Sequence, residues 1–294
     1  MIIEAKGIRK DFIRKGSGTN VFTAVQETDL VLDEGIVTAI RGRSGSGKST
    51  LLNMLAGILE PTAGEVIYTN TGDRYGENAF SGAGDKRGEG VTAATESRHA
   101  ENVRVSAERR HGESIPAIEA DSPGKSIYAM GDEALSQFRN RHIGYIPQGT
   151  SAISSLTVEE NILLPCRMRK AGSREDEEKA YARAQQLMEE MAIRHLAGEK
   201  PGKLSGGELR RMAIARAMVL SPGVILADEP TGDLDDENTA IVFEMLRRSA
   251  QQGACVLIVT HEEDVEKFAD RVYRMDAGVL KAADPIAWKA ADPY

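Results

Sequence analysis

Long apolar segments are missing from this chain of 294 residues. Its longest uninterrupted apolar run is six residues, Ala254 to Val259, whereas a helix needs about 18 or more apolar residues to cross a bilayer. No apolar stretch after Met1 is long enough for a secretory signal. These absences predict a cytoplasmic chain that does not itself span a membrane.

Cysteine and an excess of basic charge are missing as well. The two cysteines, Cys166 and Cys255, lie far apart among apolar neighbours, so we expect no disulfide and thiols that fill space. The 45 acidic side chains outnumber the 37 basic ones, which gives a net charge of -8. Because a negative molecule repels a phosphate backbone, nucleic acid is not an expected partner. Otherwise the composition, 41% hydrophobic and 28% charged, is that of a globular protein.

Short β-branched apolar runs recur with helical patterns between them. These runs are Ile36–Ile40, Ile143–Ile146, Val224–Ala227 and Cys255–Val259. Such runs are typical of central strands in a parallel sheet with helices on both faces. They predict an α/β protein with a mostly parallel central sheet. Polar and turn residues separate three further strand candidates, which predict an N-terminal antiparallel β-subdomain: Ile2–Ala5, Val21–Val25 and Thr28–Leu32.

A segment poor in apolar residues interrupts this pattern. Between Thr71 and Lys125, six of 55 residues are Val, Ile, Leu or Phe and eight are Gly. Burying so few apolar side chains would not offset the conformational entropy that ordering the segment costs. We therefore expect a flexible insertion. Its basic stretch RHAENVRVSAERRH is interspersed with Glu and is expected to be solvated rather than a docking patch.

The remaining segments predict a single domain, residues 1–282, with a C-terminal tail at 283–294. A helical subdomain is expected at 149–222, with a charged helix near Ser173–Met191 and another helix after Leu204. The predicted core consists of residues 1–70, 126–148 and 223–282.

A phosphate-binding pattern follows the first apolar run. The residues GRSGSGKST match Gly, four residues, Gly, Lys, Ser/Thr between a strand pattern and a helical pattern. Glycines allow successive amides to point at phosphate oxygens, and the helix adds the positive end of its dipole. Lys48 supplies a charge to the phosphates and Ser49 a hydroxyl for Mg²⁺. The predicted site consists of Gly42, Arg43, Ser44, Gly45, Ser46, Gly47, Lys48, Ser49 and Thr50.

Two consecutive carboxylates follow the apolar run Val224–Ala227. Asp228 and Glu229 would lie at the carboxyl end of a buried strand, where open α/β sheets place ligands. Asp228 is predicted to orient hydrated Mg²⁺, and Glu229 to polarise the water that attacks the γ-phosphate. An N-capping Asp for the next helix would also explain such a strand end, so the prediction depends on the neighbouring motifs.

A second cluster of small residues opens a helical pattern in KLSGGELRR. Ser205, Gly206 and Gly207 would expose amides at a helix start, which predicts a second anion site. One ATP does not need two such sites from the same face of one chain. The second site is therefore expected to serve a nucleotide held by a neighbouring molecule.

These motifs, in this order, resemble the ATP-binding-cassette ATPases. The chain carries a Walker A motif (GRSGSGKST), a signature (LSGGE), a Walker B motif (VILADE) and a switch histidine (VTHEE). The resemblance covers everything except residues 71–125 and the last dozen. It implies a P-loop fold, hydrolysis of ATP with Mg²⁺, and a head-to-tail homodimer. The residues implied to contact ATP across that dimer are Leu204, Ser205, Gly206, Gly207 and Glu208.

The resemblance also implies roles for single residues. Gln148, in IGYIPQ, is implied to reach Mg²⁺ together with Ser49 and Asp228 and to sense the γ-phosphate. His261 is implied to contact the γ-phosphate and to order the attacking water, beside Glu229.

Further roles concern the dimer and the base. Asp233 and Asp235 are implied to communicate across the dimer. Phe12 falls at the place of an aromatic residue that stacks on adenine; Phe22 is the competitor, and we expect it to pack within its strand instead.

Within the family, ADEPTGDLD, ALSQFRNRHIGYIPQ and LTVEENILLP look most like the ATPases of lipoprotein-release, macrolide and antimicrobial-peptide export systems and of a cell-division relative. This implies a separate membrane permease that holds the chain at the inner face of the plasma membrane, for export or extraction of a lipophilic or peptide substrate. The region after Gln148 is implied to contact the permease. Pro147 and the insertion depart from the family pattern.

Other roles of the same family remain as alternatives. Regulation of a cell-division or envelope partner without solute transport is not separated from export by the sequence. A DNA-repair or translation ATPase is less favoured, because the insertion has no heptads and the chain carries one copy of each motif.

Overall fold

The computed structural model describes residues 1–16, 18–69, 126–149, 151–169, 174–232 and 234–283. The predicted insertion, Asp233 and residues 284–294 of the predicted tail lie outside the described residues. The described residues belong to one unit, formed by Met1–Thr71 and Pro123–Tyr294. Among their helices, none combines the length and apolarity that crossing a bilayer requires.

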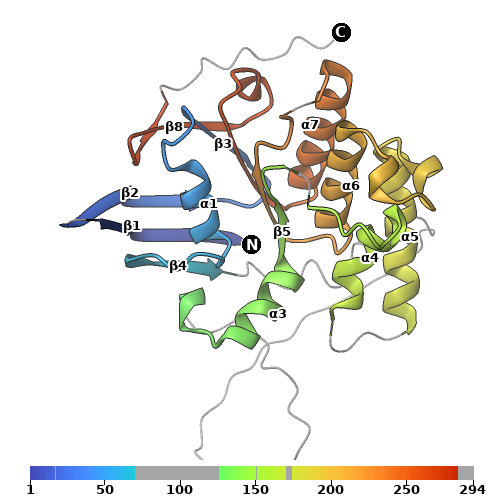
Figure 1. The fold of residues 1–294 in the computed structure, drawn as a ribbon, viewed down its shortest axis with the longest axis horizontal. Coiled ribbons are helices and arrows are strands. Elements are labelled where there is room, and N and C mark those ends of the chain that lie inside the picture. Colours follow the sequence, from blue (N-terminus) through green and yellow to red (C-terminus); the bar gives the residue numbers. More distant parts are fainter. Residues whose placement is uncertain (17, 70–125, 150, 170–173, 233, 284–294) are drawn as a thin grey trace, which may run out of the picture. The chain divides into compact units, whose positions relative to one another are not determined.

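A three-stranded antiparallel sheet begins the chain, as predicted. It consists of β1 (Ile2–Gly16), β2 (Gly18–Leu32) and β4 (Ala63–Thr69), in the order β2-β1-β4 (Figure 1). The separate segments expected at Val21–Val25 and Thr28–Leu32 are wrong, because β2 includes both. A β-bulge carries the strand past the polar residues between them: Thr28 pairs with Ile8 and Val25 with Lys10.

The central sheet has six strands, in the order β5-β6-β7-β3-β8-β9. The first five are parallel, and β9 pairs antiparallel with β8 at one edge. The predicted mostly parallel sheet is confirmed, although β8 and β9 had no counterpart in the sequence prediction. The strands are β3 (Val37–Arg41), β5 (Ile143–Ile146), β6 (Val224–Asp228), β7 (Cys255–Thr260), β8 (Arg271–Asp276) and β9 (Val279–Ala282).

Helices connect these strands. They are α1 (Lys48–Leu55), α3 (Asp132–His142), α4 (Val158–Arg167), α5 (Arg174–Glu190), α6 (Gly206–Met218) and α7 (Asp236–Gln251), with short 3₁₀ helices η1 (Ile127–Ala129), η2 (Arg194–Leu196), η3 (Pro201–Lys203) and η4 (Asp264–Lys267). The two helices expected near Ser173–Met191 and after Leu204 are α5 and α6. A capping box between Thr157 and Glu160 fixes the start of α4.

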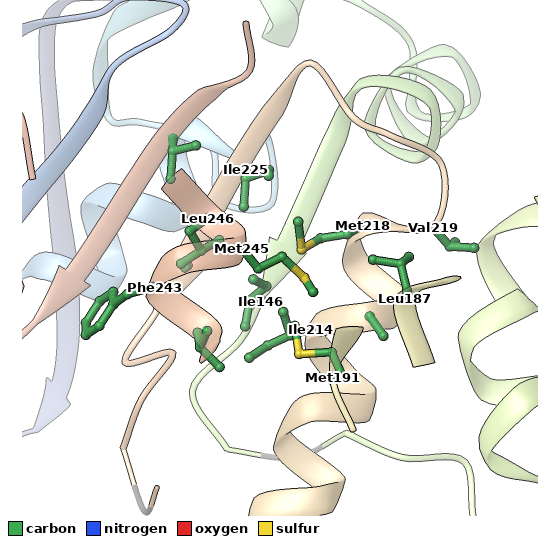
Figure 2. Packing of buried hydrophobic residues seen from close by; sticks show 14 of the residues in the cluster. Ile146, Leu187, Met191, Ile214, Met218, Val219, Ile225, Phe243, Met245 and Leu246 are labelled. Carbon is green, nitrogen blue, oxygen red and sulfur yellow. The ribbon is translucent and has the colours of Figure 1, made fainter. Parts of the chain in front are cut away.

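Alternate residues of the central strands enter two apolar clusters. In β6, Val224 and Leu226 pack with α1 and with the antiparallel sheet, whereas Ile225 and Ala227 pack with α4 to α7. Figure 2 shows the cluster that contains Ile225, in which Met218 of α6 and Leu246 of α7 also lie. The expected helical cover is therefore found on one face, while α1, α3 and the antiparallel sheet share the other. Burial on both faces explains why β6 and β7 are apolar at nearly every position.

A single β-bridge closes the ends of the predicted insertion. Ile67 of β4 pairs antiparallel with Ser126, so the chain leaves and re-enters the described unit at neighbouring points. A short connection can therefore replace the segment.

We expect a chain whose residues 70–125 are replaced by a Gly/Ser linker to fold and to keep ATP binding. If the insertion is flexible, as predicted, a linker of about seven residues halves the length of this loop about three times. Each halving lowers the entropic cost of loop closure by about 0.6 kcal/mol, so the free energy of unfolding rises by up to about 2 kcal/mol. Urea unfolding of both chains measures this change. A shortened chain that does not fold would show that the segment is part of the core.

Candidate functional site

The predicted phosphate loop lies between β3 and α1. Gly47, at the start of α1, has a φ of 105°, and a Cβ there would lie 2.3 Å from the carbonyl oxygen of Ala24. Only glycine fits both conditions. The Lys48 side chain is 6% exposed, and its Nζ donates hydrogen bonds to the carbonyl oxygens of Gly42 at 2.7 Å and Arg43 at 3.2 Å. The lysine therefore curls back over the loop that precedes it.

The turn between β8 and β9 supports this loop from outside. The amide of Gly278 donates to the carbonyl oxygen of Ser46 at 2.9 Å, and the carbonyl oxygen of Gly278 accepts from the amide of Gln26 at 2.8 Å. A Cβ on Gly42 would lie 2.2 Å from the carbonyl oxygen of Met275. The loop is thus held between β2 and the β8–β9 turn, which are distant in sequence.

Glu229 follows β6 at the carboxyl ends of the parallel strands. It has a left-handed φ of 47°, which is unfavourable for a residue with a side chain. Its Oε2 accepts a hydrogen bond from Thr260 Oγ1 at 2.7 Å, and its Oε1 lies 2.9 Å from Nδ1 of His261. The carboxylate is 11% exposed and the imidazole 67% exposed. The structure therefore brings together the two predicted catalytic residues, with one side of the pair open to solvent.

Asp228 is the more buried carboxylate, at 4% exposure. Its Oδ1 has no hydrogen-bond partner in the part of the chain that the structure describes. Burial raises the pKa of Asp228, and a hydrogen bond with the Ser49 side chain opposes that rise. A buried carboxylate oxygen without a partner, beside a hydroxyl, is the type of oxygen ligand set that Mg²⁺ prefers. These residues fit the cation that the sequence predicts.

An open cavity of about 1400 Å³ connects these elements. It is lined by most of the predicted nucleotide residues: Phe12, Gly42, Arg43, Ser44, Gly45, Ser46, Gly47, Lys48, Ser49, Thr50, Gln148, Glu229 and His261. Residues that the sequence reasoning did not assign also line it, among them Arg41, Glu263 and Arg274. A single cavity therefore runs from the aromatic residues of the β1–β2 hairpin to the Glu229–His261 pair.

Both candidate aromatic residues border this cavity. Phe12 and Phe22 are directly paired across β1 and β2 and are 40% and 45% exposed. Phe22 therefore borders the same cavity as Phe12, and the geometry does not favour Phe12 over it. The Lys10 ammonium lies 5.5 Å from the centre of the Phe12 ring, which adds a cation to this end of the cavity.

The predicted signature residues do not line the cavity of their own chain. Ser205 caps α6: its Oγ accepts from the amide of Glu208 at 3.3 Å, and its own amide donates to the Glu208 carboxylate at 2.7 Å. The Ser205 amide, and then the Ser205 hydroxyl at 2.9 Å, donate to the Glu208 carboxylate and lower its pKa. Ser205 and Gly206 are exposed, whereas Leu204, Gly207 and Glu208 are half-buried. The helix start is thus ordered, and it is open to a molecule outside the chain.

The two aspartates predicted to communicate across the dimer have different outcomes. Asp235 caps α7, because its Oδ1 accepts hydrogen bonds from the amide and the side chain of Asn238 at 2.8 and 2.7 Å. Asp233 lies outside the described residues. The capping contact gives Asp235 a local structural role in the single chain.

Two arginines near the site, the half-buried Arg41 and the buried Arg210, were missed by the sequence reasoning. Arg41 ends β3 and pairs with Glu263 and Glu266, which follow His261. Arg210 of α6 is 3% exposed and donates to backbone carbonyl oxygens on both sides of Gln148 and at the end of β6. For Arg210 the available signal was a charged residue inside an apolar helical pattern, which needs partners once it is buried.

Comparison with known proteins agrees with this geometry. A family model described as "ABC transporter" matches residues 25–109 and 115–232, more than half of the chain. The lipoprotein-releasing system ATP-binding protein LolD of Chromohalobacter salexigens is 32% identical over 264 residues, covering 90% of this chain and 87% of that protein. LolD of Geobacter metallireducens is 31% identical, with 96% and 98% covered.

Two solved structures show the same fold. "Dimeric Structure of MJ0796, a Bacterial ABC Transporter Cassette" aligns with a TM-score of 0.69 and 26% identity, covering 97% of this chain and 100% of that one. The dimeric post-hydrolysis state of the same cassette, bound to ADP and Pi, aligns with a TM-score of 0.69 and 25% identity over the same shares.

Proposed function

Since the chain belongs to the ABC transporter family as one of its ATPases, we propose that two copies close head to tail around two ATP molecules and thereby drive a separate membrane permease. One observation carries this proposal. The phosphate loop, Gln148, Glu229 and His261 line one cavity, whereas the signature residues lie elsewhere on the same chain. A nucleotide in the cavity is therefore open on the side where a second chain can add its signature.

Different residues of the cavity bind different parts of the nucleotide. Amides of the loop from Gly42 to Thr50 and the Lys48 ammonium bind the β- and γ-phosphates. Asp228, Ser49 and Gln148 would hold Mg²⁺, which supplies positive charge to the phosphate oxygens when it is bound. Phe12 or Phe22 stacks on adenine, since both rings are exposed at the far end of the cavity.

Hydrolysis is assigned to the Glu229–His261 pair. Glu229 accepts a proton from the water that attacks the γ-phosphate in line, which is the work of a general base. Thr260 and His261 each hold one oxygen of this carboxylate, so its orientation is set before the nucleotide arrives. The exposed His261 ring remains accessible to the γ-phosphate and to the attacking water.

The second chain would add an anion site through α6. Leu204 to Glu208 of one protomer would then contact the γ-phosphate held by the other, and Asp233 and Asp235 would lie at the contact between the two protomers. ATP makes these cross-chain contacts only in the closed dimer, so it shifts the population toward closure and hydrolysis reverses the shift. The cassette dimer described above supports this assembly.

A mixing experiment tests the head-to-tail arrangement. Lys48→Ala removes the phosphate charge but leaves the signature intact, and Ser205→Arg blocks the signature but leaves the phosphate loop intact. At an ATP concentration near the wild-type KM, each variant alone is expected to have little activity. Random pairing gives about half mixed dimers with one of two sites complete, so we expect a mixture to regain about a quarter of the wild-type ATPase rate. A mixture as inactive as its components would contradict sites shared between chains.

We assign the contact with the permease to a groove beside the loop that follows Gln148. This groove, of about 240 Å³, is lined by residues of α3, α4 and α6, including Arg139, Pro165 and Arg216. Arg216 also donates to the carbonyl oxygen and the hydroxyl of Ser151, at 2.6 and 2.7 Å. A partner seated in the groove would therefore respond to movement of the loop that reaches the nucleotide.

Such a partner would hold the chain at the inner face of the plasma membrane. The relatives named above are ATP-binding proteins of lipoprotein-releasing systems, which supports export or extraction of a lipophilic substrate. Co-purification of the tagged chain from solubilised membranes tests this. A co-purified permease-like subunit supports the proposal, and a membrane partner without a transport domain favours regulation of a cell-division or envelope protein instead.

A further inference from the structure

We propose that Arg210 is a positioning residue for ATP hydrolysis, which fixes the backbone of Glu229 and the loop of Gln148 in one arrangement. This inference rests on the proposed function, because it assigns how the hydrolytic site is assembled. Arg210 does not line the cavity, so it acts through residues that do.

Among the residues that the structure describes, five backbone carbonyl oxygens accept hydrogen bonds from the guanidinium of Arg210. Its Nε donates to Pro230 at 2.9 Å, and its Nη2 donates to Asp228 at 2.9 Å and to Glu229 by a short contact. Its Nη1 donates to Pro147 at 2.6 Å and to Gly149 at 2.7 Å. The side chain is 3% exposed, so water does not substitute readily for these donors.

Three of these acceptors are the consecutive carbonyls at residues 228 to 230. Glu229, in their middle, has the left-handed φ of 47°. Arg210 stabilises this unfavourable conformation, because the carbonyls of the turn converge on one planar cation with five N–H groups. Without the guanidinium, these carbonyls lose its hydrogen bonds, and the Glu229 carbonyl keeps a long one from the Gly232 amide, at 3.3 Å. The turn then relaxes toward an ordinary φ. The Glu229 carboxylate would then leave its place between Thr260 and His261.

The other two acceptors flank Gln148 on both sides. Pro147 and Gly149 are held to the same guanidinium as the turn at Glu229. Arg216, six residues further along α6, holds Ser151 of the same loop. Helix α6, which begins at the signature, is therefore hydrogen-bonded both to the Gln148 loop and to the backbone of Glu229. A movement of α6 on dimer closure would be transmitted to both.

The neighbouring Arg211 provides a matched control. It lies on the same helix and is 8% exposed, but its Nε donates to the carbonyl oxygen of Met191 at 2.9 Å and its Nη1 to Asn238. Arg211 therefore holds the residue that follows α5 and the start of α7, and these partners lie outside the Glu229 turn and the Gln148 loop. Replacing either arginine removes a buried cation from α6, so loss of thermal stability alone does not distinguish them.

We expect Arg210→Met to lower kcat about 100-fold while the KM for ATP changes less than about threefold, because the base is displaced and the phosphate loop is not. Arg210→Lys keeps the charge, but one ammonium group cannot replace the planar set of donors. We therefore expect at least a tenfold loss of kcat from that milder variant. Arg211→Met should keep kcat within about threefold of wild type. A folded Arg210→Met or Arg210→Lys with kcat near that of Arg211→Met would overturn the inference.

Hydrogen exchange separates this inference from the proposed function. In Arg210→Met, or in Arg210→Lys if the methionine variant does not fold, amides in residues 145–149, 151–153 and 227–232 should exchange faster. In Arg211→Met the faster amides should instead lie near Met191 and Asn238. Unchanged exchange at 145–149, 151–153 and 227–232 in a folded Arg210 variant refutes the positioning role. A wild-type chain that turns over no ATP refutes the proposed function, and exchange still decides whether Arg210 holds the two loops.

Discussion

Replacing Glu229 with glutamine is expected to lower the ATPase kcat by about 10²- to 10⁴-fold, the usual contribution of a general base. The amide has the size of the carboxylate and can still accept the hydrogen bond from Thr260 Oγ1, but it cannot take a proton from water. ATP binding should persist, because the phosphate loop is unchanged. The closed dimer should then accumulate, and size-exclusion chromatography with ATP and Mg²⁺ measures it beside the steady-state rate.

Glu263→Gln is the control for this change. Glu263 borders the same cavity, but its carboxylate is 88% exposed and pairs with Arg41, so its ion pair is worth little. We expect its kcat to stay within about threefold of wild type. A Glu229→Gln chain that hydrolyses ATP at the wild-type rate would remove Glu229 as the base, and one that stays monomeric with ATP would argue against the closed dimer.

Replacing Lys48 with alanine should weaken ATP binding by about 10- to 150-fold, because a hydrogen bond to a charged group contributes about 1.5–3 kcal/mol. Lys48 is buried and already directed along the loop by the carbonyl oxygens of Gly42 and Arg43, so little ordering remains to be done when the phosphates arrive. Equilibrium binding of a fluorescent ATP analogue measures the change.

The alternative cause of such a loss is a misshapen loop. Lys48→Arg separates the two causes, since it keeps a cation but must fit a larger fork into a site that is 6% exposed. We expect it to bind ATP better than Lys48→Ala but less well than wild type. Wild-type affinity in Lys48→Ala would exclude the contact between Lys48 and the phosphates.

The central sheet was predictable because its signal is local. β5, β6 and β7 coincide with short apolar runs, as strands covered on both faces must. The extent of β1 and β2 was not predictable, because cross-strand pairing maintains them through polar residues such as Asp11 and Thr23. Helix α3 also gave little signal, since only Leu135 and Phe138 of its residues are buried.

In the candidate site, too, the local motifs were predictable and the long-range contacts were not. The phosphate loop and the Asp228–Glu229 pair were found because each is one continuous motif on one strand end. The contacts that orient them join distant parts of the chain: Arg210 reaches Pro147 across 63 residues, and Arg41 reaches Glu266 across 225 residues. Spacing along one sequence carries no signal for such contacts, and the same holds for the exposure of Phe22.

The turn that supports the phosphate loop has a consequence for biosynthesis. The amide of Gly278 donates to Ser46, so a nascent chain still lacking that turn has the complete Walker A sequence without its outer support. Translation must advance by more than two hundred residues before the nucleotide cradle acquires all its backbone contacts. The phosphate loop therefore acquires its final conformation late in synthesis, although its residues are among the first to be translated.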